Sequence, residues 1–201
     1  MNYIIATLAL CISLLSFGQK AEVFYKNKQD SSFNCYTVIT PNSEIKGLII
    51  RDYSHMVNLQ SKSPYKWQEL ALSSGLAVLY TVSSNFFPDL FYDDSGPIIL
   101  DEIVHEVMTN YKIPPKNLFI GGISASGTRA LRYAQFCEQE KSKYNTKINA
   151  VFSVDSPLDL ERFYQSSERI LQRKLKKGSM REATLIIKTF NEKMNGNPRD
   201  N

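Results

Sequence analysis

Short apolar runs alternate with amphipathic stretches along most of this 201-residue chain, and this alternation constrains the fold more than any other feature. The apolar runs lie at 76–82, 118–120 and 148–154, and the stretches with helical periodicity lie at 67–72, 98–111 and 128–137. Apolar strands separated by helices are typical of a parallel sheet that is covered on both faces. The pattern therefore predicts an α/β fold with a mostly parallel sheet between two helical layers.

Further elements are predicted before this alternating region and at the start of its second helix. Residues 33–39 alternate with period two, and turn residues 41–43 lead into a second apolar run at 47–50. This arrangement predicts an early antiparallel pair of strands. Ser95 and Pro97 stand where a cap and a first turn belong for the helix predicted at 98–111.

The carboxyl-terminal part contains two more amphipathic stretches. They lie at 160–175 and 181–194 and are separated at Gly178. Ser179 and Glu182 form a capping box for the second stretch. We therefore expect a pair of helices at 160–195.

The chemistry of the chain is concentrated in the heptapeptide 121–127, Gly-Gly-Ile-Ser-Ala-Ser-Gly, which joins a predicted strand to a predicted helix. So short a turn forces its central residue, Ser124, into a strained backbone conformation and requires small residues two places to either side. Gly122 and Ser126 occupy those two places. Ser124 would then stand at the positive end of the helix, where the amide of Ala125 can donate to an oxyanion.

This motif resembles the nucleophile elbow of the α/β-hydrolase superfamily, in particular its esterase and serine-peptidase-like members, whose elbow reads Gly-x-Ser-x-Gly-Gly. The matching residues are Gly122-Ile123-Ser124-Ala125-Ser126-Gly127, in which Ser126 replaces the first of the two closing glycines. The resemblance covers about residues 33–160. It implies an α/β-hydrolase-like three-layer sandwich with strands one to six of an eight-stranded sheet, and a catalytic role for Ser124. It also places a second oxyanion donor in the loop 51–54, although the residue cannot be chosen from the sequence.

Two other interpretations of the loop are open. A phosphate-binding P-loop has the glycine spacing of Gly122 and Gly127, but Thr128-Arg129 stands where its Lys-Ser/Thr pair must be. Alternatively, the small residues only permit close packing, and Ser124 is no more than a helix cap.

A nucleophilic serine needs a general base and an acid that orients the base. The only histidines, His55 and His105, both precede Ser124, whereas the resemblance implies the order serine, acid, histidine. We expect His105 to be a surface residue and His55 to lie near the site without being an ordinary triad base. Asp155 follows the strand next to the elbow strand, and the resemblance makes it a tentative catalytic acid, with a simple turn as the alternative.

No other carboxylate group has the spacing of a metal site. Asp52, Asp93 and Asp94 lie in predicted loops without a further ligand at metal spacing. The sequence therefore predicts neither a metal nor another cofactor.

The amino terminus has the features of a signal peptide. Residues 3–17 carry no charge and are too few to cross a membrane, which requires about 20 apolar residues. Ser16-Phe17-Gly18 places small residues where signal peptidase requires them. We expect cleavage after residue 18 and export to the periplasm or the extracellular space, without a stable membrane anchor. A buried strand or helix is the alternative.

Cys11 would be removed with the signal peptide. The other two thiols, Cys35 and Cys137, fit neither a metal site nor a dense disulfide framework. We expect buried apolar fillers, and pairing between them stays open.

Charge argues against a nucleic-acid partner. Residues 1–160 carry 14 Lys and Arg against 15 Asp and Glu, whereas residues 161–201 carry 10 against 5. This modest excess in the last part lacks the clustered face or motif of a nucleic-acid binder. The helices at 160–195 stand where related proteins insert cap helices, so a bias towards anionic or amphipathic substrates competes with a simple solvated helix pair.

The sequence thus predicts a signal peptide at 1–18 and an α/β-hydrolase-like domain at 19–201 that acts on small esters or peptides. The resemblance implies two further strands and a later histidine, so we expect a truncated and catalytically incomplete hydrolase. A non-catalytic binding domain with the same fold is the alternative. The run at 148–154 would form an exposed sheet edge, which favours self-association.

Overall fold

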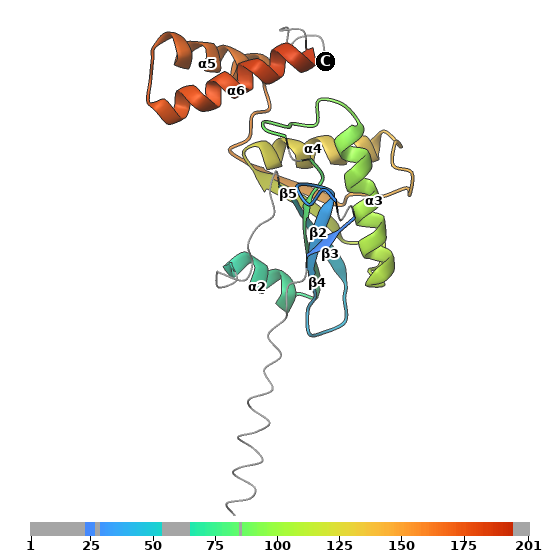
Figure 1. The fold of residues 1–201 in the computed structure, drawn as a ribbon. Helices are drawn as coiled ribbons and strands as arrows, with labels where there is room; N and C mark the ends of the chain where they lie inside the picture. Colours follow the sequence, from blue (N-terminus) through green and yellow to red (C-terminus); the bar gives the residue numbers. More distant parts are fainter. Residues whose placement is uncertain (1–22, 27–28, 54–64, 85, 195–201) are drawn as a thin grey trace, which may run out of the picture.

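A computed structural model describes residues 23–26, 29–53, 65–84 and 86–194, and it contains the expected α/β sandwich (Figure 1). Its sheet has the order β1-β2-β4-β3-β5-β6. The strands are β1 (Phe24–Tyr25), β2 (Cys35–Ile39), β3 (Gly47–Asp52), β4 (Leu76–Val82), β5 (Leu118–Ile123) and β6 (Ala150–Val154). The neighbours β4, β3, β5 and β6 run parallel to one another, so the expectation of a mostly parallel sheet is confirmed.

The predicted pairing of the two early strands is wrong. β2 pairs with β4 in antiparallel fashion, and β3 lies on the other side of β4, parallel to it. The turn residues between β2 and β3 therefore lead the chain past β4 instead of closing a hairpin. Strand periodicity identified both strands, but partner choice depends on where the later strand β4 inserts.

The helices cover the sheet on both faces. The structure contains α2 (Lys66–Ser73), α3 (Ser95–Asn110), α4 (Ala125–Glu138), α5 (Leu160–Gln172) and α6 (Lys177–Met194). One face packs against α3 and α4, and we call it the covered face. The other face packs against α2, and we call it the α2 face.

Two helix starts differ from the sequence prediction. α3 begins at Ser95 itself, because the Asp93 side chain accepts a 2.9 Å hydrogen bond from the Ser95 amide. α6 begins at Lys177, so Gly178 and Ser179 lie inside its first turn and form no cap. The amide of Met180 already donates to a carbonyl four residues earlier.

The main core lies between the covered face and its two helices. Leu48 and Ile50 from β3 are fully buried there, together with Leu100, Ile103 and Val104 from α3. A smaller cluster on the α2 face joins strand side chains to α2. Alternate residues of β2, β3 and β4 enter the two clusters, as the pleat of a strand requires.

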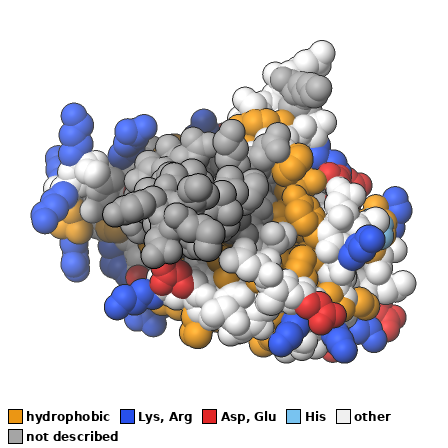
Figure 2. Space-filling model, turned by 90° about the horizontal axis from the view of Figure 1, so that it is seen from below, with side chains coloured by type: hydrophobic (Ala, Val, Ile, Leu, Met, Phe, Trp, Pro, Cys, Tyr) orange, Lys and Arg blue, Asp and Glu red, His pale blue; other side chains and the backbone are white. Residues whose placement is uncertain are grey.

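The α5–α6 hairpin stands apart from the sheet and its covering helices (Figure 1). Phe190 is its buried centre and contacts the ring of Tyr92 edge-on, at 5.6 Å between centroids. Lys193 lies 3.8 Å from the carboxylate of Asp93. Lys and Arg side chains gather on the left side of the space-filling view, the side on which the hairpin projects in Figure 1 (Figure 2).

The other sequence predictions concern the amino terminus, the two cysteines and the edge of the sheet. The predicted signal peptide at 1–18 lies outside the described residues, so cleavage and export stay predictions. No helix in the described part of the chain is long and apolar enough to cross a membrane. Cys35 and Cys137 are buried and unpaired, as expected for apolar fillers. β6 forms an edge of the described sheet, and self-association through it stays a prediction.

Candidate active site

Ser124 is the single residue between β5 and α4, and its backbone is strained. Its φ of 56° and ψ of −134° lie outside the regions that L-residues ordinarily adopt. Such a conformation costs about 1 to 3 kcal/mol and persists only where the surrounding structure imposes it. The Ser124 side chain is exposed, as the elbow interpretation requires.

Close backbone contacts explain the small residues around Ser124. A Cβ on Gly122 would overlap the carbonyl group of Ser126 and lie 2.6 Å from the amide nitrogen of Gly127. A Cβ on Gly127 would collide with the Ser156 hydroxyl and lie 2.6 Å from the Ser153 hydroxyl. The chain therefore turns too tightly at the elbow for larger residues at these glycine positions.

Backbone hydrogen bonds hold the elbow in place. The Ser124 amide donates to the Val154 carbonyl of β6 at 2.9 Å, and the Ser124 carbonyl accepts from the Gly127 amide at 2.9 Å. The Ser124 side chain makes no capping hydrogen bond. The alternative in which this serine serves only as a helix cap therefore lacks the contact that would define it.

The predicted oxyanion donor, the amide of Ala125, lies at the start of α4. Ala125 opens α4, and the first amides of a helix have no acceptor within the helix. In the loop proposed for a second donor, the amide of Tyr53 already donates to the Thr81 carbonyl at 2.9 Å. Arg51 and Asp52 belong to β3 itself and not to a loop, which corrects their expected position. Ser54 lies outside the described residues.

The residues that follow the elbow do not match a phosphate site. The Thr128 hydroxyl donates to the Pro157 carbonyl at 2.9 Å, which ties α4 to the segment after β6. The Arg129 side chain is buried beneath the elbow and does not reach the loop surface. Neither residue is placed to hold a phosphate or its metal ion, which removes the basis of the P-loop interpretation.

Arg129 instead forms a buried ion pair with Asp52. Their side chains are 1% and 2% exposed, and Asp52 also accepts 2.9 Å hydrogen bonds from the amide and the hydroxyl of Ser83. Burial raises the pKa of the Asp52 carboxyl, while the Arg129 charge and the two Ser83 donors oppose that rise. This network joins the carboxyl ends of β3 and β4 to the first turns of α4.

Sequence reasoning missed this network, although a signal was present. Arg129 shares one helical face with Tyr133 and Phe136, both of which are buried. A cation on the apolar face of a helix indicates a buried acidic partner. Its identity could not be read from the sequence, because Asp52 lies 77 positions earlier.

The structure places the candidate base and acid as follows. His105 is exposed on α3 and stacks on Tyr144, with ring centroids 3.8 Å apart, so it is the expected surface residue. His55 lies outside the described residues. Asp155 directly follows β6 with a φ of 49°, next to the strand residue that accepts from the Ser124 amide. Its exposed carboxylate makes no hydrogen bond or ion pair with the described residues.

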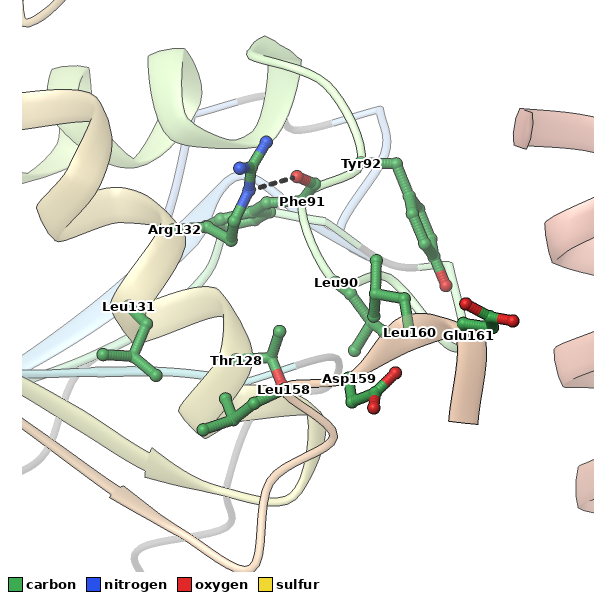
Figure 3. A pocket seen from close by; sticks show the side chains of 10 residues that line it. All are labelled: Leu90, Phe91, Tyr92, Thr128, Leu131, Arg132, Leu158, Asp159, Leu160 and Glu161. Carbon is green, nitrogen blue, oxygen red and sulfur yellow. Dashed lines mark hydrogen bonds between the residues drawn. The ribbon is translucent and has the colours of Figure 1, made fainter. Parts of the chain in front are cut away.

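Two hollows are lined by residues near the elbow, although Ser124 itself lines neither. The first, of about 440 Å³, lies beside α4 and the start of α5 (Figure 3). Thr128 and Leu131 of α4 face Leu158 and Leu160 across it, and the Arg132 side chain donates to the Phe91 carbonyl at 3.3 Å at its edge. The second, of about 690 Å³, lies on the α2 face and includes Ile123, the residue before Ser124. We call it the α2 groove.

No group of three metal-ligating side chains comes together among the described residues.

Comparison with known proteins supports the fold. No family model and no curated protein matches the chain in sequence. A solved structure from Legionella pneumophila, assigned as a hydrolase, aligns with 94% of this chain and 58% of its own length, at 11% identity and a TM-score of 0.50. Candida antarctica lipase A in its closed state aligns with 65% of this chain and 35% of its own, at 12% identity and a TM-score of 0.48. A carboxyl esterase from Bacillus coagulans aligns with 83% and 53%, at 12% identity and a TM-score of 0.41.

The chain thus spans between about a third and three fifths of the length of these proteins. At such low identity the likeness shows the fold alone, and the fold is α/β-hydrolase-like.

Proposed function

We propose that this chain is a serine hydrolase that attacks an ester or amide carbonyl through Ser124. The observation that carries the proposal is the strained backbone of Ser124, at φ 56° and ψ −134°. A residue in this conformation persists only where its surroundings over-determine it, and such residues cluster at functional sites. Here the conformation exposes a hydroxyl at the amino end of a 14-residue helix.

The proposed chemistry is acyl transfer. The Ser124 Oγ attacks the carbonyl carbon and loses its proton to a base, while the Ala125 amide donates to the developing oxyanion. The bond to the leaving alcohol or amine then breaks, and the leaving group takes up the proton. Water releases the acyl group as a carboxylic acid and restores the serine.

Small ester substrates fit the first hollow. Its leucine-rich lining beside α4 suits a short acyl or alcohol group, and Thr128 places it one turn from the nucleophile. The acidic side chains of Asp159 and Glu161 also line it, so a neutral substrate fits better than an anionic one. The basic α5–α6 hairpin would favour anionic groups only at its own surface.

The general base is the open part of the proposal. The described residues contain one histidine, His105, and it stacks on Tyr144 at the surface of α3. This favours acylation without ordinary triad turnover. It also supports the alternative, a non-catalytic binding domain that keeps the elbow.

A fluorophosphonate probe separates these possibilities, because it labels an activated serine covalently. We expect labelling of the wild-type chain and its loss in Ser124→Ala, with the fold unchanged by circular dichroism. Ser126→Ala is the matched control and should still be labelled. Loss of labelling in Ser126→Ala alone would contradict the register of the elbow, and an unlabelled wild-type chain would favour the binding domain.

Turnover of a short p-nitrophenyl ester gives the second readout. We expect release of about one equivalent of nitrophenol per chain without sustained turnover, as an acyl-enzyme that lacks a base would show. Sustained turnover that disappears in His55→Ala would contradict catalytic incompleteness and assign the base to His55.

A further inference from the structure

A buried arginine lies at the centre of the α2 groove. Arg51 of β3 is 7% exposed, and its side chain lines the groove together with Ile123, Phe152 and Val154. The pleat of β3 turns Arg51 away from the covered face, which receives its neighbours Ile50 and Asp52. The guanidinium group is therefore held among apolar side chains, with the hollow of about 690 Å³ in front of it.

Three aromatic rings surround the Arg51 guanidinium. Its central carbon lies 5.0 Å from the ring of Trp67, 5.3 Å from that of Phe152 and 5.5 Å from that of Tyr53. Burial raises the pKa of Tyr53, and the Arg51 charge opposes that rise. The rings fix the position of the cation from three sides.

Arg51 has no acidic partner among the described residues. Its buried Nε makes no hydrogen bond, and none of the ion pairs in this part of the chain includes it. The stretch 54–64, which follows β3, contains no Asp or Glu. The cation in the groove thus has no counter-charge among the described residues.

The energetics favour an anionic occupant. Removing a cation from water without a partner is unfavourable, and contacts with aromatic faces return only part of that cost. A carboxylate completes the balance best, because a guanidinium can donate two parallel hydrogen bonds to it.

The rest of the groove is apolar and open. Ile123 and Val154 are 57% and 51% exposed, and they are neighbours across the pair β5–β6. Leu70 on α2 is exposed on the opposite wall. An occupant therefore needs an apolar body in addition to its anionic end.

We propose that the α2 groove binds an amphipathic carboxylate, with the carboxylate paired to Arg51 and an alkyl or aryl tail lying along Ile123 and Val154. This site is separate from the acylation of Ser124 and does not depend on it. Fatty acids and aryl carboxylates share the required chemistry.

Trp67 provides a direct readout, because it is the only tryptophan of the chain and lines the groove. The full chain is titrated with decanoate below its micellar concentration while Trp67 fluorescence is followed. We expect a saturable change with decanoate and binding weaker by about tenfold or more with decanol or decyltrimethylammonium, which lack the negative charge.

Variants assign the charge to Arg51. Arg51→Met should weaken decanoate binding by about tenfold or more, because the charge-assisted hydrogen bonds are lost. Arg132→Met, at an exposed position of α4, is the matched control and should bind as the wild type does. Val154→Glu alters an exposed side chain, so it tests the site independently of folding, and its negative charge should also weaken binding.

Ser124→Ala should retain full decanoate binding, which separates this proposal from the proposed hydrolase activity. Equal binding by Arg51→Met and wild type, or equal binding of decanol and decanoate, would overturn the proposal. A fluorescence change that depends on protein concentration instead of ligand concentration, together with faster sedimentation, would also overturn it. A second copy of the chain would then occupy the groove.

Discussion

Each face of the sheet contains a buried arginine, and the two arginines differ in the groups that surround them. On the covered face, Arg129 is enclosed by an ion pair with Asp52 and lies 5.2 Å from the ring of Phe91. On the α2 face, Arg51 is surrounded by three rings and has no acidic partner in the part of the chain that the structure describes. Asp52 and Arg51 are consecutive residues of β3, so the pleat alone decides which face receives each charge.

The apolar side chains differ in the same way. Leu48, Ile50 and Ile120 are fully buried on the covered face, whereas Ile123, Phe152 and Val154 on the α2 face remain exposed by about two fifths or more. Helices of the described chain enclose the covered face. Over β5 and β6, the α2 face has no covering helix among the described residues. The elbow is therefore supported from the covered face and accessible from the α2 face.

The largest expected effect comes from breaking the ion pair of the covered face. Arg129→Met leaves the Asp52 carboxylate buried without its cation, so we expect the free energy of unfolding to fall by about 3 to 5 kcal/mol. Urea denaturation measures the change. Arg132→Met on the exposed side of the same helix should stay within about 0.5 kcal/mol. Similar losses of unfolding free energy in both variants would show that the Arg129 side chain stabilises α4 itself instead of neutralising the buried Asp52 carboxylate.

A second expected effect compares leucines of the two faces. Leu100→Ala on α3 opens a cavity in the main core and should cost about 2 to 5 kcal/mol. Leu70→Ala on α2 changes a side chain that is 68% exposed, so its cost should stay within about 0.5 kcal/mol. A large loss for Leu70→Ala in the same denaturation experiment would mean that the α2 face is covered in solution.

The smallest expected effect concerns the buried thiols. Burial raises the pKa of Cys35 to about 11 and that of Cys137 to about 12. In a Cys11→Ser chain at pH 8, a disulfide reagent should therefore label the native thiols on the order of a hundredfold more slowly than in urea, because the thiolate is the reactive form. Fast labelling of the native chain would show that solvent reaches the two thiols in the folded state.

The same shifts give stability a pH dependence. An unfolded thiol loses its proton near pH 8.5, whereas the folded thiols keep theirs to about pH 11. The unfolded state binds fewer protons in this window, so the free energy of unfolding falls as pH rises through it. Thermal denaturation between pH 8 and pH 11 measures the fall.

The elbow could be predicted from the sequence because it is local. Its requirements involve only Gly122, Ser124, Ser126 and Gly127, and the structure shows the steric reason for the glycines. The strands and helices were also predicted well, since their periodicity is a property of short segments. Their ends were less well predicted, as the start of α6 at Lys177 shows.

Contacts between distant segments could not be predicted. The insertion of β4 between β2 and β3, and the pairing of Asp52 with Arg129, both depend on where residues far apart in sequence meet. The alternation of β3 indicates that Arg51 and Asp52 face opposite sides. It does not indicate that only one side supplies a counter-ion.

One contact on the α2 face joins two strands that share no hydrogen bonds in the sheet. Gly121 of β5 has no side chain, and the ring of Phe152 from β6 occupies the space that a Cβ would need. That ring thereby reaches the guanidinium of Arg51 on β3, across β5. Substitutions at Arg51 and Phe152 are consequently not additive in free energy, although β3 and β6 are never neighbours in the sheet. β5, the strand that leads into Ser124, is thus spanned by a contact between side chains of its two neighbouring strands.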